Sequence, residues 1–219
     1  YRCDDNSVLV VENPVTAVKV TSADGETLDL PAAPPGQLSR YGQTIYALVL
    51  ALLVGGAGVV FPFLPRHLSL VGAVTIGIPG FALSFRRADT PCQSGYLARV
   101  LRFSVPAGLV SALATFSTYW MARANGADLE QARSVATIAL TSLGLWILYR
   151  LAHPLGRWEV GLLVGLVAGF GLMFAPPLSR FYALALPSPE LTIGLVASLS
   201  ALIVALELAV THPVRLDQV

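Results

Sequence analysis

The chain has 219 residues, a formal net charge of +1 and a charged fraction of only 12%, whereas 55% of its residues are hydrophobic. Soluble domains carry about 25% charged residues, so this composition, with a mean hydropathy of +0.68, excludes a soluble protein. The near-neutral charge gives no reason to expect a nucleic acid as a partner. We expect an all-α integral membrane protein of the inner (plasma) membrane, with the lipid bilayer as its first partner.

The polar residues 1–40 are expected to form a small cytoplasmic segment without a site of its own. Residues 15–21 alternate between apolar and polar side chains, a turn signal follows at Asp24-Gly25, and residues 27–30 complete a candidate β-hairpin. The proline-rich residues 31–36 are typical of a stiff linker. Residues 1–40 contain no hydrophobic signal sequence and the chain begins at Tyr1, so we interpret it as a fragment, a processed product or a trimmed chain.

Six apolar ranges within residues 41–211 are each predicted to cross the membrane, because a span needs about 20 apolar residues. An even number of spans places both termini on one side, and the excess of arginine there indicates the cytoplasm. Residues 212–219 then form a cytoplasmic tail. The predicted spans are residues 41–61, 68–85, 97–121, 134–151, 159–174 and 191–210. The predicted cytoplasmic arginines are Arg40, Arg86, Arg87, Arg99, Arg102, Arg150, Arg157 and Arg215, against Arg66, Arg123, Arg133 and Arg180 on the other side.

Glycines recur in the fifth predicted span at nearly every fourth position. Such spacing places small residues on one helix face and predicts a surface for close helix packing. The residues concerned are Gly161, Gly165, Gly169 and Gly171.

The second predicted span contains a signal that interrupts helices. Pro79 removes one backbone donor and crowds the carbonyl four residues earlier, and Gly77 and Gly80 ease irregular backbone around it. We therefore expect the second of six transmembrane helices to be broken between Gly77 and Pro79. Broken backbone at membrane depth is found where it lines a cavity, and in transporters it often faces an ion or substrate. The alternative is a plain proline kink in a packing helix.

The same stretch carries a family pattern. It reads Phe63-Leu64-Pro65, then Leu68, then Thr75-Ile76-Gly77-Ile78-Pro79. This pattern resembles the sixth membrane helix of the bacterial P-type cation-transporting ATPases. The resemblance implies that the chain is the C-terminal membrane region of such a pump, its last six helices. In the calcium pumps of the family the matching segment is Asn-x-x-Thr-Asp-Gly-x-Pro, and its Asn and Asp bind the ion. Those two positions are Gly72 and Ile76 in this chain.

Candidate ion-pathway residues follow from the interrupted helix and from one buried charge. The helix supplies Thr75, Ile76, Gly77 and Pro79, and Glu207 is the ionisable residue that lies clearly inside a predicted span. Charges inside a membrane are costly and often functional, so Glu207 is a candidate cation ligand. The alternative is that it snorkels or pairs with an arginine.

No catalytic residue or metal cluster is expected in this chain. The histidines His67, His153 and His212 fall in separate loops, and Cys3 and Cys92 have no partner at redox or metal spacing. The family's Asp-Lys-Thr-Gly-Thr phosphorylation motif is absent, so the ATP and Mg that the resemblance implies would bind outside this chain.

Three functions remain open. The first is the membrane portion of a P-type cation-translocating ATPase, whose partners would be a cation and catalytic domains absent from this chain. The second is a non-enzymatic, ATPase-derived six-helix protein that acts as a partner or regulator of another membrane subunit. The third is an unrelated small transporter or channel. Whether the chain belongs to an enzyme is left open, since it has no nucleotide site of its own.

Overall fold

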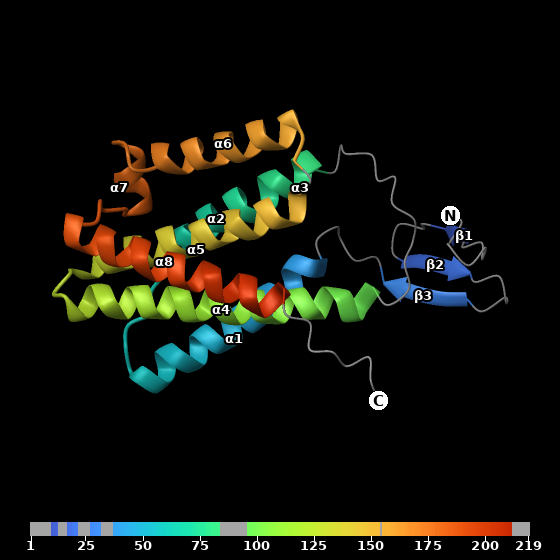
Figure 1. Ribbon diagram of the computed structural model, residues 1–219, viewed down its shortest axis with the longest axis horizontal. Coiled ribbons are helices and arrows are strands. Elements are labelled where there is room, and N and C mark those ends of the chain that lie inside the picture. The colour runs from blue at the N-terminus through green and yellow to red at the C-terminus, as the bar shows by residue number, and fades with distance from the viewer. Residues whose placement is uncertain are drawn as a thin grey trace.

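The computed structural model describes residues 10–12, 17–21, 27–31, 37–83, 96–153 and 155–211 (Figure 1). Three short strands precede the helices: β1 (Val10–Glu12), β2 (Ala17–Thr21) and β3 (Thr27–Pro31). They form an antiparallel sheet in the order β1-β2-β3, in which Val18 pairs with Leu30 and Thr21 with Thr27. The two predicted strands are thus present and paired, while their connecting turn, both cysteines and the tail from His212 lie outside the described residues.

Long helices occupy all six ranges in which the sequence predicts spans. Three described stretches are long and apolar enough to cross a membrane, namely Pro65–Leu83, Leu129–Ala152 and Pro189–Glu207, and Gly42–Ala57 is a shorter apolar helix. That all six cross the membrane therefore stays a prediction. The helical elements are α1 (Gln37–Ala57), α2 (Pro65–Gly72), η1 (Ala73–Gly77), α3 (Ile78–Leu83), α4 (Tyr96–Ala124), α5 (Leu129–Ala152), α6 (Arg157–Leu172), α7 (Leu178–Tyr182) and α8 (Pro189–Thr211).

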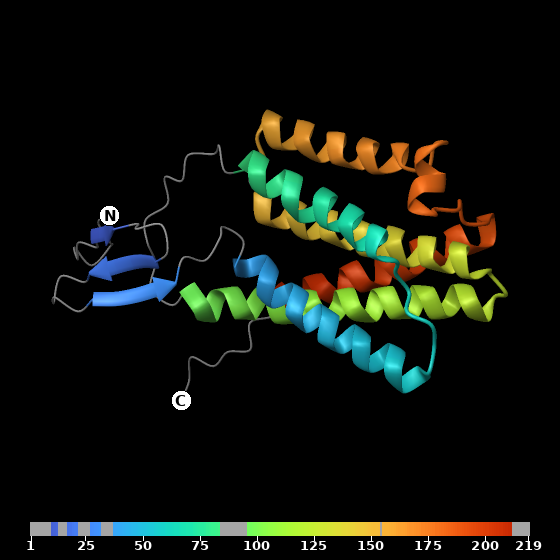
Figure 2. The same cartoon turned by 180° about the vertical axis from the view of Figure 1, so that it is seen from behind.

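Helix α4 packs against α1, α5 and α8 (Figures 1 and 2). Its contact with α1 is close because Gly108 has no side chain: a Cβ there would lie 2.8 Å from the carbonyl oxygen of Gly42. Two buried hydroxyls on α4 bond to their own helix, Thr115 to the Ser111 carbonyl at 2.8 Å and Thr118 to the Ala114 carbonyl at 2.7 Å. Neither hydroxyl therefore needs a ligand to satisfy it.

Helix α6 lies at the edge of the bundle, next to α2, α3 and α5 (Figure 2). Leu166 and Phe170 join it to Leu70, Val74 and Leu148 in one buried apolar cluster. Its four glycines do not contribute to this contact, because a Cβ built on any of them meets no atom within 4 Å. The predicted glycine packing face is thus unused within the described part of the chain.

The expected break in the second helix is wrong. The backbone stays right-handed helical at Gly72 (φ −59°, ψ −41°) and at Ile78 (φ −62°, ψ −48°), so one helix continues from Pro65 to Leu83. Instead of breaking, residues Ala73–Gly77 widen into a π-helical turn, in which the N–H of Ile78 donates to the carbonyl of Ala73, five residues earlier. A wider turn just before Pro79 gives the proline ring room that a regular α-turn denies it.

Candidate functional site

The π-helical turn is the irregular backbone of the candidate ion pathway. Pro79 is buried and has no N–H, so a carbonyl one turn earlier, on Val74 or Thr75, loses the helical donor that any other residue would supply. The Thr75 hydroxyl donates to the Val71 carbonyl at 2.8 Å and is therefore already engaged with its own helix. At this turn, the oxygen that lacks its helical donor is therefore a backbone carbonyl and not the Thr75 hydroxyl.

Thr75 lies against α5 at a point where that helix has no side chain. A Cβ added to Gly144 would be 2.6 Å from Cγ2 and 2.9 Å from Cβ of Thr75. Real Cβ atoms do not approach so closely, so only glycine at this position allows η1 and α5 to meet as they do. The contact orients the π-helical turn through shape, without any charge.

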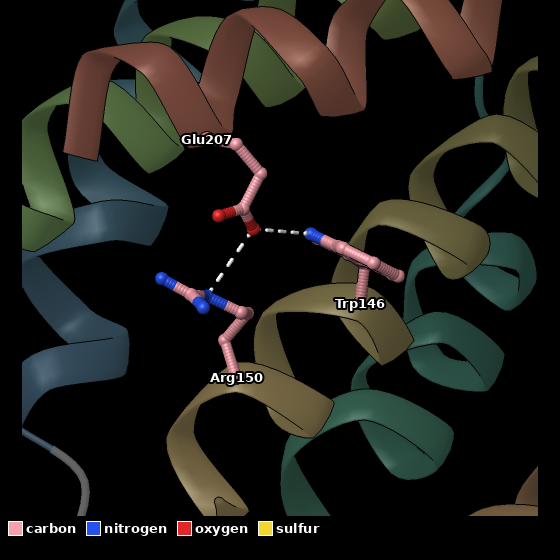
Figure 3. Close-up of polar contacts among 3 residues, drawn as sticks. All are labelled: Trp146, Arg150 and Glu207. Carbon is pink, nitrogen blue, oxygen red and sulfur yellow. Dashed lines mark hydrogen bonds and ion pairs between the residues drawn. The ribbon is translucent and has the colours of Figure 1, made fainter. Parts of the chain in front are cut away.

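Glu207 on α8 is paired with α5, as Figure 3 shows. Its Oε1 lies 3.2 Å from Nε of Arg150 and accepts a 3.0 Å hydrogen bond from Nε1 of Trp146. The side chains of Arg150 and Glu207 are 40% and 29% exposed. Of the two expectations for Glu207, this geometry matches pairing with an arginine.

The structure separates Glu207 from the other candidate residues. Successive residues of an α-helix are rotated by about 100°, so Trp146 and Arg150 lie about 200° and 240° around α5 from Gly144. Thr75 touches α5 at Gly144, whereas Glu207 touches it at Trp146 and Arg150. The π-helical turn and Glu207 therefore lie on opposite faces of α5 and do not form one oxygen cage.

Trp146 and Arg150 were not predicted as partners of Glu207. Arg150 entered only the predicted orientation, although the spacing of the two residues by four positions places them on one face of α5. That spacing could have indicated a shared contact. It could not have named Glu207, which lies 57 residues beyond Arg150 in the chain.

The described residues contain no group of three or more His, Cys, Asp or Glu side chains that could hold a metal ion. A cavity of about 430 Å³ between α5, α6 and α8 is lined almost entirely by apolar side chains, with Ser142 and Thr192 as its hydroxyls. Thr192 already donates to the Ser188 carbonyl at 2.9 Å, so this cavity is a poor cation site.

The known proteins to which this chain is similar are bacterial calcium- or cation-transporting ATPases. The calcium-transporting ATPase CtpE of Mycolicibacterium smegmatis is 34% identical over 152 residues, which cover 63% of this chain and 19% of that protein. The protein of the same name from Mycobacterium tuberculosis is 35% identical over the same length. The probable cation-transporting ATPase exp7 of Streptococcus pneumoniae is 24% identical over 136 residues, or 58% of this chain and 18% of that protein.

No protein-family model and no solved structure matches the chain. The chain spans about a fifth of the length of the curated relatives that it matches. Over about three fifths of its length, this chain is thus similar to bacterial calcium- and cation-transporting ATPases.

Proposed function

We propose that this chain is the membrane portion of a P-type cation-translocating ATPase and that the helix formed by α2, η1 and α3 lies on its ion pathway. The observation that carries the proposal is the π-helical turn at Ala73–Gly77 directly before the buried Pro79. Single π-turns inside α-helices are rare and frequent at functional sites. The relatives named above are calcium or cation transporters, which makes a cation the natural cargo.

The turn would supply only part of a cation's coordination shell. Calcium takes about six to eight oxygen ligands, with carboxylates usually among them. Positions 72 and 76 carry glycine and isoleucine, which have no side-chain oxygen, and the Thr75 hydroxyl is engaged. The remaining ligands would then come from parts of the pump outside the described residues. All six helices would span the bilayer in this proposal, with both termini in the cytoplasm.

Replacing Pro79 tests the role of the turn. In membrane vesicles from cells that express the whole protein, we expect Pro79→Ala to lower ATP-dependent uptake of radioactive calcium by about tenfold or more, equivalent to ~1.4 kcal/mol. The alanine restores a backbone donor and lets the turn revert to regular α-helix. Pro106→Ala is the matched control, because Pro106 also lies inside a long helix, α4. Equal uptake in the wild type and a folded Pro79→Ala variant would reduce the turn to a packing feature.

A second candidate is a non-enzymatic partner or regulator derived from such an ATPase. It is favoured by the engagement of the Thr75 hydroxyl and by the ion pair of Glu207 with Arg150. The intact mass of the protein purified from its own membranes separates the candidates. A mass several times the 23.1 kDa of this chain supports the pump, whereas a mass near that value supports the regulator.

A further inference from the structure

A cavity of about 230 Å³ lies where the first turns of α2 and α5 meet the residue after α7. Unlike the π-helical turn of the candidate ion pathway, this cavity is lined by charged side chains. The lining residues are Leu64, Arg66, Leu129, Glu130, Arg133 and Ala183. Two arginines and one glutamate give the lining a net charge of +1.

Both arginines retain unused hydrogen-bonding capacity. Nη1 of Arg66 donates to the Phe181 carbonyl at 2.7 Å, and Nη2 of Arg133 donates weakly to the Phe61 carbonyl at 3.4 Å. Nε of Arg133 is buried and has no acceptor among the described residues. Neither arginine forms an ion pair within the described ranges. Since a guanidinium carries five N–H donors, this pair has donors to spare for an anion.

The wall of the cavity is held in place by a buried histidine. His67 is fully buried; its Nδ1 accepts the Leu64 N–H at 3.3 Å, so its Nε2 donates to the Tyr182 carbonyl at 2.7 Å. This tautomer is neutral and adds no charge to the lining. The hydrogen bond from His67 to Tyr182 and the one from Arg66 to Phe181 together join the start of α2 to α7. The guanidinium of Arg66 is therefore positioned before any ligand arrives, which lowers the entropic cost of binding.

We propose that this cavity binds a phosphate group between Arg66 and Arg133. The planar fork of arginine matches phosphate oxygens and forms short, charge-assisted hydrogen bonds with them. A net lining charge of +1 balances a single negative charge, as carried by a phosphodiester. The cavity lies at the ends of predicted spans, where lipid head groups are found. An anionic lipid and free phosphate share this chemistry, and the experiment below distinguishes them. The proposal does not depend on transport activity.

Native mass spectrometry of the full, delipidated protein in detergent tests the proposal. We expect the protein to bind added dioleoyl-phosphatidylglycerol, and we expect Arg66→Gln or Arg133→Gln to weaken this binding by about tenfold to a hundredfold. Arg180→Gln is the matched control, since Arg180 is an exposed arginine on the neighbouring α7 that does not line the cavity. Inorganic phosphate is titrated in parallel, and its displacement of the lipid at millimolar concentration would identify free phosphate as the ligand.

A variant that is expected to strengthen binding keeps the test decisive even if an arginine variant fails to fold. Glu130→Gln removes the acidic charge of the lining and should tighten phosphatidylglycerol binding, by about threefold to tenfold at the effective dielectric near a protein surface. A purely structural role for the arginines predicts no such gain. Binding that is unchanged in Glu130→Gln, or equal in the wild type and both arginine variants, would overturn the proposal.

Discussion

The π-helical turn at Thr75 and the carboxylate of Glu207 contact different faces of α5, and the two contacts are of different physical kinds. On one face Gly144 accepts Thr75 so closely that only the missing side chain permits the contact. On the other face Trp146 and Arg150 hold the carboxylate of Glu207 with a hydrogen bond and an ion pair. The first contact depends on shape, and it lies beside the π-helical turn where Pro79 supplies no backbone donor. The second depends on charge and engages the carboxylate.

This difference between the two contacts means that the π-helical turn and the carboxylate of Glu207 are not equally good candidates for an ion site. A carboxylate that already has a guanidinium partner gains less from a cation than an unpaired one would. Thr75 and its turn therefore remain the stronger ion-pathway candidate, and Glu207 is better explained as a tie between α5 and α8. Three experiments test this contrast, in order of decreasing expected effect.

Gly144→Ala should break the shape-based contact. Its new Cβ would lie 2.6 Å from Cγ2 of Thr75, and overpacking of this kind costs about 1–3 kcal/mol. We expect a lower thermal unfolding temperature in detergent. Thr75→Ser removes that methyl group and keeps the hydroxyl, so it should recover part of the loss in the double variant. A Gly144→Ala variant as stable as the wild type would contradict the close approach of η1 and α5.

Glu207→Gln and Arg150→Gln measure the charge-based contact. In a double-mutant cycle we expect a coupling of about 1 kcal/mol, because both side chains are partly exposed and the attraction is screened. The calcium dependence of any transport should stay unchanged in Glu207→Gln. A large change in that dependence, with intact folding, would return Glu207 to the ion pathway and remove the contrast between the two faces.

Gly165→Ala on α6 is the matched counterpart of Gly144→Ala. A Cβ at Gly165 meets no atom within 4 Å, so we expect no clash and a gain of up to about 0.5 kcal/mol from helix propensity. The same unfolding assay measures it. A clear loss of stability would mean that another helix covers the glycine face of α6 in the intact protein.

The helical ranges could be predicted because runs of apolar residues long enough for a membrane are visible in the sequence itself. The pattern at Phe63 and Thr75–Pro79 likewise suggested a resemblance to cation-transporting ATPases, and the relatives found are proteins of that kind. The predicted break at Pro79 was wrong. A proline in the sequence shows only that one backbone donor is missing, and it does not determine how the backbone adapts to that loss. Here a π-helical turn absorbs the proline and the helix continues.

The sequence alone thus determined a helical membrane protein, the positions of its long helices and its similarity to cation-transporting ATPases, because composition, hydropathy and motif spacing can be read without knowledge of helix packing. Only the tertiary structure decided that Glu207 meets Arg150 across 57 residues, that Thr75 lies against Gly144, and that Arg66 and Arg133 line one cavity. Each of these depends on how helices far apart in the chain approach and rotate against one another. Those geometries are set by packing between helices, which no local pattern encodes.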